Sequence, residues 1–200
     1  MKRTSIQDGD TWLHAYFDKT RLALFDDAVI PQMIELRDRA IATADAGGKI
    51  IFAGNGASAS IASHCAVDFT KQAKVQAISF NEANLITCFA NDYGFENWIA
   101  RAIEAYAGKD DLVVLISSSG KSPNMLCAAA HSKSQGLPVV TFSGFAEDNP
   151  LRASGDLNLW VDSRSYNIVE CTHMFWLMMV CDLIVGSAEY EVTQESRTPS

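Results

Sequence analysis

The chain has 200 residues, 48% of them hydrophobic and 20% charged, which is typical of one folded globular domain and unlike disordered or fibrous proteins. Its formal net charge is −8, from 24 acidic and 16 basic residues. This excess of negative charge provides no general attraction to nucleic acid or to an anionic membrane, so we expect neither as a partner. An anionic ligand must therefore be held by local groups.

The cysteines and the apolar runs indicate a cytoplasmic protein. The five cysteines lie singly in apolar segments, without the spacing of a zinc knuckle or a redox motif, which favours reduced thiols. The first residues of the chain lack the continuous apolar stretch of a signal peptide. The apolar run from Met174 to Val185 is about a dozen residues long and contains Asp182, so we predict no membrane span.

Helical and strand-like segments alternate along the chain. Apolar residues recur at helical spacing in two N-terminal segments, and the second of these ends at Gly47 and Gly48. Short, continuously apolar runs that indicate buried strands follow, separated by further helical segments. The predicted strands are residues 49–53, 75–80, 112–116, 137–142 and 157–161. The predicted helices are residues 12–25, 29–46, 58–71, 84–107, 122–135 and 167–188, with an interruption around 91–94.

The apolar strands indicate a parallel sheet, because connecting helices bury both faces of such a sheet. The predicted fold class is α/β, with a doubly wound, flavodoxin-like parallel sheet in three layers, N-terminal helices and a long C-terminal helix. We expect residues 1–192 to form a single domain with an N-terminal helical extension, followed by a polar tail at 193–200. Ligands of open parallel sheets bind beyond the carboxyl ends of the strands, so the turns after the strands should carry the function.

The most informative turn is the serine-rich segment 117–122, which follows the central predicted strand. It places four hydroxyls and several backbone N–H groups at the start of a helix, and Pro123 suits the first helical turn. Exposed N–H groups and the positive end of the helix dipole favour a phosphate monoester. Capping of an ordinary loop needs one serine rather than four, so we predict a phosphate site. Lys121 either contacts this ligand or is solvated.

The turn after the first predicted strand, Gly54-Asn55-Gly56-Ala57-Ser58, offers a different chemistry. It lacks the spacing of the dinucleotide-binding G-x-G-x-x-G motif and the lysine of a P-loop, so we predict no nucleotide cofactor. Its glycines permit close approach of the backbone to a ligand, while Asn55 and Ser58 can hydrogen-bond to sugar hydroxyls.

Three segments, Gly54–Ser58, Asn91–Phe95 and Ile116–Ser122, in this order and spacing resemble the phosphoheptose (sedoheptulose-7-phosphate) isomerase family of SIS (sugar isomerase) domains. The similarity covers nearly the whole chain. It implies an aldose–ketose isomerase that converts a ketoheptose phosphate through an enediol, in cell-envelope or capsule heptose synthesis, and a homotetramer with active sites between subunits. The implied substrate-binding residues are Asn55, Gly56, Ser58 and Asp92 for the sugar and Ser117, Ser118, Ser119 and Ser122 for the phosphate.

Isomerisation needs a base that moves a proton between adjacent carbons, and an acid or a metal that manages charge on the enediol oxygens. The family carries a His and, four residues later, a Glu on the helix after the first turn, and the matching positions here are His64 and Asp68. Such a pair projects from one helical face and can share a ligand or a proton. In the C-terminal helix, the resemblance sets Glu170 at the family's Gln and His173 at a His. Met178 occupies the position where a catalytic His is expected.

Two hypotheses follow from these departures. In the first, the chain is an isomerase with a re-formed site for Zn²⁺ or another divalent metal, because an anionic Glu170 would compensate for the lost imidazole. The catalytic residues are then Asp68 or Glu170 as the base, together with His64, and the metal ligands are His64, Asp68, Glu170 and His173. In the second, the catalytic residues have decayed. The protein is then a sugar-phosphate sensor or a protein-binding module, as in an SIS family that associates with the bacterial replication initiator.

The C-terminal helix also indicates an oligomer, because residues at nearly every angle around it are apolar. One domain of this size seldom buries such a helix on all sides, which agrees with the tetramer that the resemblance implies. The length and stereochemistry of the sugar stay open, since they depend on residues 81–97 and on neighbouring subunits.

Overall fold

The computed structural model describes residues 8–189, so the predicted polar tail at 193–200 lies outside the described residues. Its five strands are β1 (Ile50–Gly54), β2 (Ala77–Ser79), β3 (Leu112–Ser117), β4 (Val139–Gly144) and β5 (Leu157–Val161). The helices before β3 are α1 (Gly9–Leu24), η1 (Asp27–Val29), α2 (Ile30–Asp45), α3 (Ala57–Lys71), α4 (Ala83–Tyr93) and α5 (Trp98–Tyr106). Those after β3 are α6 (Pro123–Ser134), α7 (Pro150–Ser154) and α8 (Tyr166–Val185).

The strands form one parallel sheet in the order β2-β1-β3-β4-β5. From β1 the chain winds to β2 on one side, and from β3 it winds to β4 and β5 on the other. The order therefore reverses between β1 and β3, where ligands of doubly wound sheets bind. In this pair Ile50 lies beside Leu112 and Gly54 beside Ile116, so the two strands end at the same edge.

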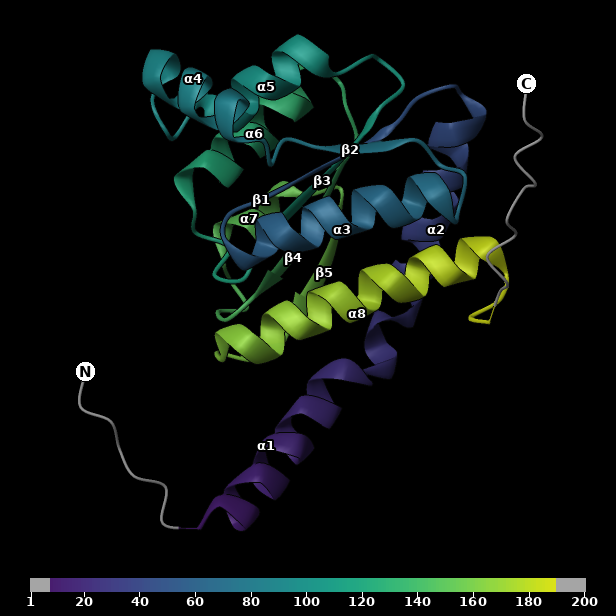
Figure 1. Cartoon of the computed structure of the whole chain (residues 1–200), viewed down its shortest axis with the longest axis vertical. Coiled ribbons are helices and arrows are strands. Elements are labelled where there is room, and N and C mark those ends of the chain that lie inside the picture. The colour runs from purple at the N-terminus through teal and green to yellow at the C-terminus, as the bar shows by residue number, and fades with distance from the viewer. Residues whose placement is uncertain (1–7, 190–200) are drawn as a thin grey trace, which may run out of the picture.

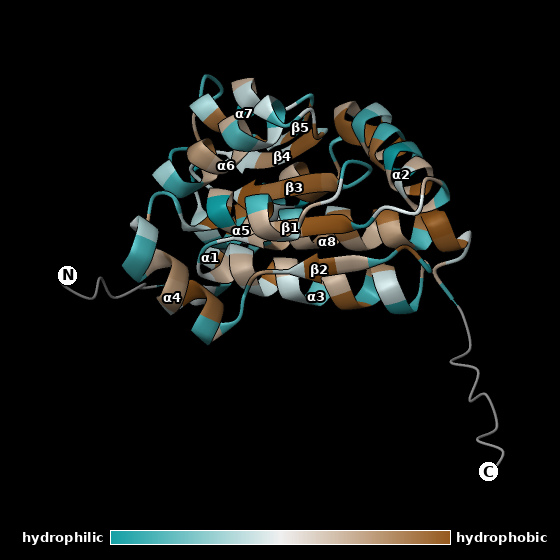
Figure 2. Cartoon of the chain, turned by 90° about the horizontal axis from the view of Figure 1, so that it is seen from above, coloured by the Kyte–Doolittle hydropathy of each residue, from teal (hydrophilic) through white to brown (hydrophobic). Residues whose placement is uncertain are grey.

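Helices cover both faces of the sheet, as the apolar strands predicted (Figure 1). Along β1, Ile50 and Phe52 join the core under α2, α3 and α8, whereas Ile51 and Ala53 join the core under α5 and α6. Because successive strand residues point to opposite faces, a strand buried on both faces is apolar throughout. Figure 2 shows these hydrophobic strands between the helical layers. The three-layer α/β prediction is confirmed.

The element boundaries differ from the predictions at two places. The strand expected at 75–80 is only β2, and the short helix α7 was not predicted. The N-cap of α7 is Asn149, whose side-chain Oδ1 accepts a hydrogen bond from the backbone N–H of Arg152. The helix expected at 84–107 has its predicted interruption, because Gly94, with a φ of +83°, ends α4 before α5 begins.

The C-terminal helix α8 spans 20 residues and is long and apolar enough to cross a membrane, the single such helix in the described part of the chain. It is longer than the run on which the sequence prediction relied. Its buried side packs on α3, α2 and the sheet, and includes Trp176, Leu177 and Val180. A core helix has this arrangement, since its buried face contacts protein rather than lipid.

The first helix stands apart from the body of the molecule. In Figure 1, α1 projects beyond the sheet, and its C-terminal end is joined to α8 by a hydrogen bond from Trp176 Nε1 to the carbonyl oxygen of Leu24 at 2.9 Å. Its large apolar side chains are largely exposed, as in Phe17 at 55% and Leu22 at 78%.

Candidate active site

A polar cavity of about 140 Å³ opens where β1 and β3 end, at the point where the strand order reverses. Its lining contains all four serines predicted to hold phosphate, together with two residues of the first turn. The lining residues are Asn55, Ser58, Ile116, Ser117, Ser118, Ser119, Ser122, Tyr166 and Glu170. We call this cavity the serine pocket. The structure therefore brings the two turns together, while the roles of their residues stay predictions.

The serine-rich turn is held in shape by its own bonds. The backbone N–H of Gly120 donates to the carbonyl oxygen of Ser117 at 3.1 Å, and the Oγ atoms of Ser117 and Ser122 lie 3.3 Å apart. Gly120 has a φ of +62°, and a Cβ there would lie 1.9 Å from Asn149 Oδ1. Only glycine satisfies both the backbone conformation and the close contact with the start of α7.

Three helices begin at this cavity: Ser58 lies in the first turn of α3, Ser122 is the N-cap of α6, and Tyr166 is the first residue of α8. Within the described chain, none of these three N-termini is capped by a side chain, whereas α1, α4 and α7 are capped by Asp8, Glu82 and Asn149. The uncapped N–H groups and the positive ends of three helix dipoles favour an anion. The site is thus suited to a phosphate in a chain whose formal charge is −8.

Two glycines shape the first turn around Asn55. Gly56 has a φ of +57°, and a Cβ at Gly54 would lie 2.5 Å from the backbone of Ser58. The backbone N–H of Ser58 donates to the carbonyl oxygen of Asn55 at 3.0 Å, and Ser58 is 4% exposed. Gly56, which we predicted to bind substrate, supports the turn, while Asn55 and Ser58 line the pocket.

Glu170 and Tyr166 bring the start of α8 into the pocket. Ser118 Oγ donates to Glu170 Oε1 at 3.4 Å, so the carboxylate lies beside the serine turn. Tyr166, which the sequence prediction missed, packs edge-on against Phe145 with ring centroids 4.7 Å apart. Its position could have been found, because the first turn of a helix that follows a parallel strand faces the same edge of the sheet as the other turns.

His64 and Asp68 form a separate pair on α3, away from the serine pocket. His64 Nε2 lies 3.1 Å from Asp68 Oδ2, and their side chains are 46% and 27% exposed. Burial, and then the Asp68 charge, raises the pKa of the Cys65 thiol to about 12 and that of the Cys181 thiol to about 11.

The pair is not part of the lining of the serine pocket. Glu170 lines that pocket, whereas neither His64 nor Asp68 is among its lining residues. Their catalytic roles therefore stay predictions.

His173 is the one predicted ligand that the structure places in the core. It is 0% exposed, stacks edge-on against Phe142, and has Nε2 at 3.0 Å from the carbonyl oxygen of Ser143. Nε2 must carry the proton of this hydrogen bond, which leaves Nδ1 as a buried acceptor without a partner among the described residues. Burial lowers the pKa of His173 to about 4, so the ring is neutral near pH 7.

The predicted metal site is not assembled in the single chain. Across residues 8–189, no three His, Cys, Asp or Glu side chains are placed to hold a metal ion. His173 turns toward β4, Glu170 lies at the serine turn, and the His64–Asp68 pair lies further along α3. The four predicted ligands do not gather at one point among the described residues of a single chain, and the metal site stays a prediction.

Asp92 is not among the residues that line the serine pocket. It is exposed on α4, where Asn91 Nδ2 donates to its Oδ1 at 2.9 Å. Its predicted contact with the sugar stays a prediction.

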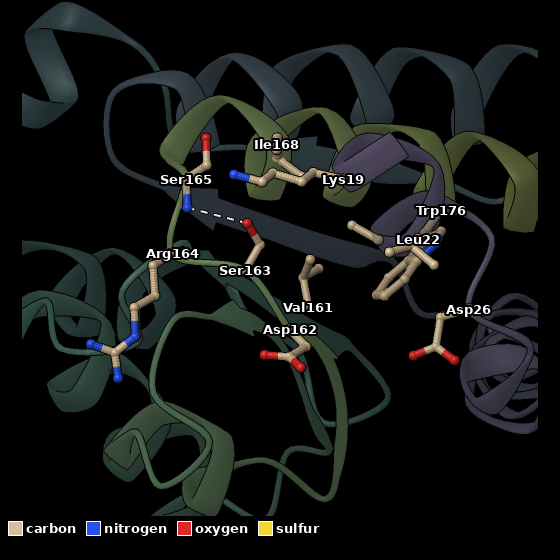
Figure 3. A pocket seen from close by; sticks show the side chains of 11 residues that line it. Lys19, Leu22, Asp26, Val161, Asp162, Ser163, Arg164, Ser165, Ile168 and Trp176 are labelled. Carbon is tan, nitrogen blue, oxygen red and sulfur yellow. Dashed lines mark hydrogen bonds between the residues drawn. The ribbon is translucent and has the colours of Figure 1, made fainter. Parts of the chain in front are cut away.

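A larger cavity, about 520 Å³, lies elsewhere, between α1, β5 and the start of α8 (Figure 3). Acidic and basic side chains line it together with Trp176, and Lys19 extends toward Ser165 while Arg164 points away from Asp26. Its lining includes none of the turn residues, and one wall is the projecting α1. We therefore assign the chemistry to the smaller serine pocket, where hydroxyls and helix N-termini meet.

Comparison with known proteins shows that this sequence is similar to SIS-domain proteins, among them phosphoheptose isomerases. The SIS domain family model matches residues 22–144. The phosphoheptose isomerase of Burkholderia pseudomallei (strain 1710b) is 32% identical over 170 residues, which cover 82% of this chain and 86% of the relative. That of Helicobacter pylori (strain HPAG1) is 35% identical over 150 residues, 72% of this chain and 78% of the relative.

A solved structure extends the likeness to the fold. A phosphoheptose isomerase from Francisella tularensis superposes with a TM-score of 0.83 at 24% identity, covering 90% of this chain and all of the other. At this identity the structural likeness establishes the fold, including the long C-terminal helix.

Proposed function

We propose, from the premise that this chain belongs to the phosphoheptose isomerase family of SIS-domain proteins, that it is an aldose–ketose isomerase acting on a ketoheptose phosphate such as sedoheptulose 7-phosphate. The observation that carries the proposal is the meeting of four serine hydroxyls and three uncapped helix N-termini at one pocket. A role in cell-envelope or capsule heptose synthesis belongs to the same proposal.

The serine turn holds the phosphate in this proposal. Ser117, Ser118, Ser119 and Ser122 donate hydroxyl protons to phosphate oxygens, and the N–H groups at the start of α6 donate from the backbone. Hydrogen bonds to a charged acceptor are roughly twice as strong as neutral ones, so local donors can hold a dianion on an acidic protein.

The sugar extends from the phosphate toward Asn55, Ser58, Tyr166 and Glu170. A cavity of about 140 Å³ is smaller than the roughly 300–1,000 Å³ of pockets that enclose a whole small molecule. One chain thus encloses the phosphate end, and the remainder of the sugar lies in the open part of the site.

The reaction moves one proton between adjacent carbons. A base removes the proton from the hydroxyl-bearing carbon next to the carbonyl, the C–H electron pair forms the enediol double bond, and an acid protonates the carbonyl oxygen. Returning a proton to the other carbon, with loss of a proton from the other oxygen, completes the exchange without net oxidation. Glu170 is the carboxylate beside the serine turn, and we assign it as the base in its own pocket.

The His64–Asp68 pair serves a pocket shared between subunits. Asp68 holds the orientation of the imidazole at 3.1 Å, and the half-exposed His64 can exchange a proton with a sugar oxygen. Because neither residue lines the serine pocket of its own chain, we place its substrate at the serine turn of another copy. Met178 replaces the family's catalytic His, so His64 is the acid in this diverged site.

A homotetramer supports this arrangement. Exposed apolar residues on α1 and α8 provide surface for other copies, including Phe17 at 55%, Leu22 at 78% and Leu183 at 42%. Light scattering on the protein as it elutes from a size-exclusion column gives the subunit number, and a monomer would contradict the shared site.

The division into one domain at 1–192 and a cytoplasmic location also stay part of the proposal. Both agree with an α8 that packs on the sheet.

Zn²⁺ or another divalent metal does not fit the single chain, because the expected ligands do not meet and His173 is engaged in the core. No step is therefore routed through a metal. Calorimetric titration with Zn²⁺ tests this fit, and we expect no binding, or equal binding by the unaltered protein and His64→Ala. Tight binding that His64→Ala abolishes would restore the metal hypothesis.

Turnover decides the proposed function. The protein is incubated with sedoheptulose 7-phosphate, with and without Zn²⁺ or Mn²⁺, and the aldose product is followed by chromatography. We expect aldose in all mixtures and none with Glu170→Gln. Calorimetric binding of the ketose phosphate without turnover would instead favour the sugar-phosphate sensor, the alternative that the comparisons do not favour.

A further inference from the structure

Two asparagine side chains close a ring of hydrogen bonds between the turns that form the serine pocket. Asn55 Nδ2 donates to Asn124 Oδ1 at 2.9 Å, and Asn124 Nδ2 donates to Asn55 Oδ1 at 2.9 Å. Asn55 lies in the turn after β1 and lines the pocket, whereas Asn124 is the second residue of α6 and is 2% exposed. The pair therefore spans the crevice between β1 and β3.

The direction of both amides is set by one backbone group. The N–H of Met125 donates to Asn124 Oδ1 at 3.1 Å, so the oxygen of Asn124 must face this N–H and Asn55 Nδ2. The nitrogen of Asn124 then faces Asn55 Oδ1. Rotating the Asn55 amide by half a turn would place its NH₂ group against the Asn124 NH₂ group and its oxygen against the Asn124 oxygen. A helix N-terminus thus specifies which way the Asn55 amide points.

The ring leaves part of Asn55 available to a ligand. Each amide has two N–H donors and two acceptor lone pairs, and the ring uses one of each. Asn55 keeps one N–H and one lone pair, both fixed in direction at the pocket. A preorganised amide loses less rotational freedom on binding than a mobile one.

We infer that Asn124 is a positioning residue of the proposed sugar-phosphate site, which orients the Asn55 amide for the sugar part of the substrate. This inference rests on the proposed function in taking Asn55 as a contact of the sugar. Asn124 itself is buried behind Asn55 and is not part of the pocket lining among the described residues. Its effect is therefore exerted through Asn55.

The experiment compares the Michaelis constants of single and double variants with sedoheptulose 7-phosphate. Asn124→Asp keeps the size of the side chain and the acceptor for the Met125 N–H, but its ionised carboxylate cannot donate to Asn55 Oδ1. We expect KM to rise about tenfold with kcat changed less than threefold, equivalent to ~1.4 kcal/mol in binding at 25 °C. Asn124→Ser is the second variant should the aspartate impair folding, which thermal unfolding reports.

The double variant separates positioning from general loosening of the fold. We expect Asn55→Ala to raise KM, and Asn124→Asp to add less than twofold in the Asn55→Ala background, because no amide remains to be oriented. Asn158→Asp is the matched control, since Asn158 is a partly buried amide that donates to Thr141 on the outer strands and lies outside the pocket lining. Its KM should equal that of the unaltered protein.

Three results would overturn the inference: an unchanged KM in a folded Asn124 variant, an unchanged KM in Asn55→Ala, or equal effects of Asn124→Asp in both backgrounds. Failure of the proposed function is a different result, namely no turnover by the unaltered protein. The same variants are then compared by calorimetric binding of sedoheptulose 7-phosphate, with the same expected tenfold loss in affinity. Absence of binding by the unaltered protein would overturn the inference as well.

Discussion

The serine pocket and the His64–Asp68 pair differ in how much of a site one chain provides. At the pocket, two turns and the N-termini of α3, α6 and α8 meet at a cavity of about 140 Å³. The His64–Asp68 pair lies partly exposed on α3 and is not part of the pocket lining. In the proposed function the phosphate is therefore held by groups of one subunit, whereas the chemistry also uses a pair that we place at the pocket of another subunit.

The largest expected effect tests whether the two regions serve one site. Glu170→Gln and His64→Ala should each lower kcat roughly 10²–10⁴-fold, the usual contribution of an acid or a base. Mixing the two variants under conditions that exchange subunits should restore a measurable fraction of the activity, because some shared sites then contain both intact residues. No recovery in a mixture whose exchange is verified by mass spectrometry would place both residues in one chain's site.

The next effect tests the backbone of the serine turn. Gly120→Ala combines a positive φ with a Cβ that would meet Asn149, so we expect the unfolding free energy to fall by about 3 kcal/mol. In a protein of this size that corresponds to a fall of roughly 6–12 °C in Tm. We also expect this variant to lose phosphate binding, because the turn cannot keep its shape.

Gly136→Ala is the matched control for this change. Gly136 has a φ of +75° but open space around its Cα, so only the conformational strain of roughly 1–2 kcal/mol applies. Phosphate affinity should be unchanged in this variant. Equal losses of phosphate binding in both variants would show that general destabilisation, rather than the turn, is responsible.

A smaller effect concerns the buried imidazole of His173. The pKa of His173 is lowered from 6.5 to about 4 in the folded state. Between these two pH values the unfolded chain therefore binds a proton at this residue that the folded chain does not. This group's contribution is present above pH 6.5 and is lost as the pH falls toward 4. We expect about 2 kcal/mol less unfolding free energy at pH 5 than at pH 7 from this residue.

Urea denaturation at the two pH values measures this loss. His173→Gln should show a smaller difference between pH 7 and pH 5 than the unaltered protein. A pH dependence that is unaffected by His173→Gln would mean that His173 is not buried as a neutral ring.

The smallest effect concerns a single hydroxyl of the pocket. Ser119→Ala should weaken the binding of inorganic phosphate by about 1.5 kcal/mol, roughly tenfold, as expected for one hydrogen bond to a charged ligand. Ser132→Ala is the control, because Ser132 is buried in α6 and donates to the carbonyl oxygen of Ala128. Its phosphate affinity should not change, and an equal loss in both variants would place phosphate elsewhere.

The turns could be predicted because their signals are local. Glycines that allow a positive φ, hydroxyls after an apolar strand and a proline in the first helical turn lie within a few residues of one another. Parallel strands end at the same edge, so these residues had to meet once the sheet was predicted. Tyr166 was missed because its only signal is its place at the start of a helix, and α7 because its cap is a single asparagine.

The orientations of Glu170 and His173 could not be predicted, because they depend on which side of α8 faces the core. The spacing of Glu170 and His173 allows both to face one ligand, yet His173 turns to the carbonyl oxygen of Ser143 on β4 while Glu170 turns to the serine turn. An apolar helix such as α8 has little hydrophobic asymmetry to indicate its orientation. Only packing against β4 and α3 selects it.

By itself, the sequence determined the parallel three-layer sheet, the position of the serine-rich turn and the family, because apolar runs, turn residues and motif order act over short stretches of chain. The tertiary structure decided the burial of His173, the position of Glu170 beside the serine turn, and the ring between Asn55 and Asn124. These depend on contacts between residues far apart in the chain, and the free energy of such contacts is set by the packing of whole helices rather than by any local pattern.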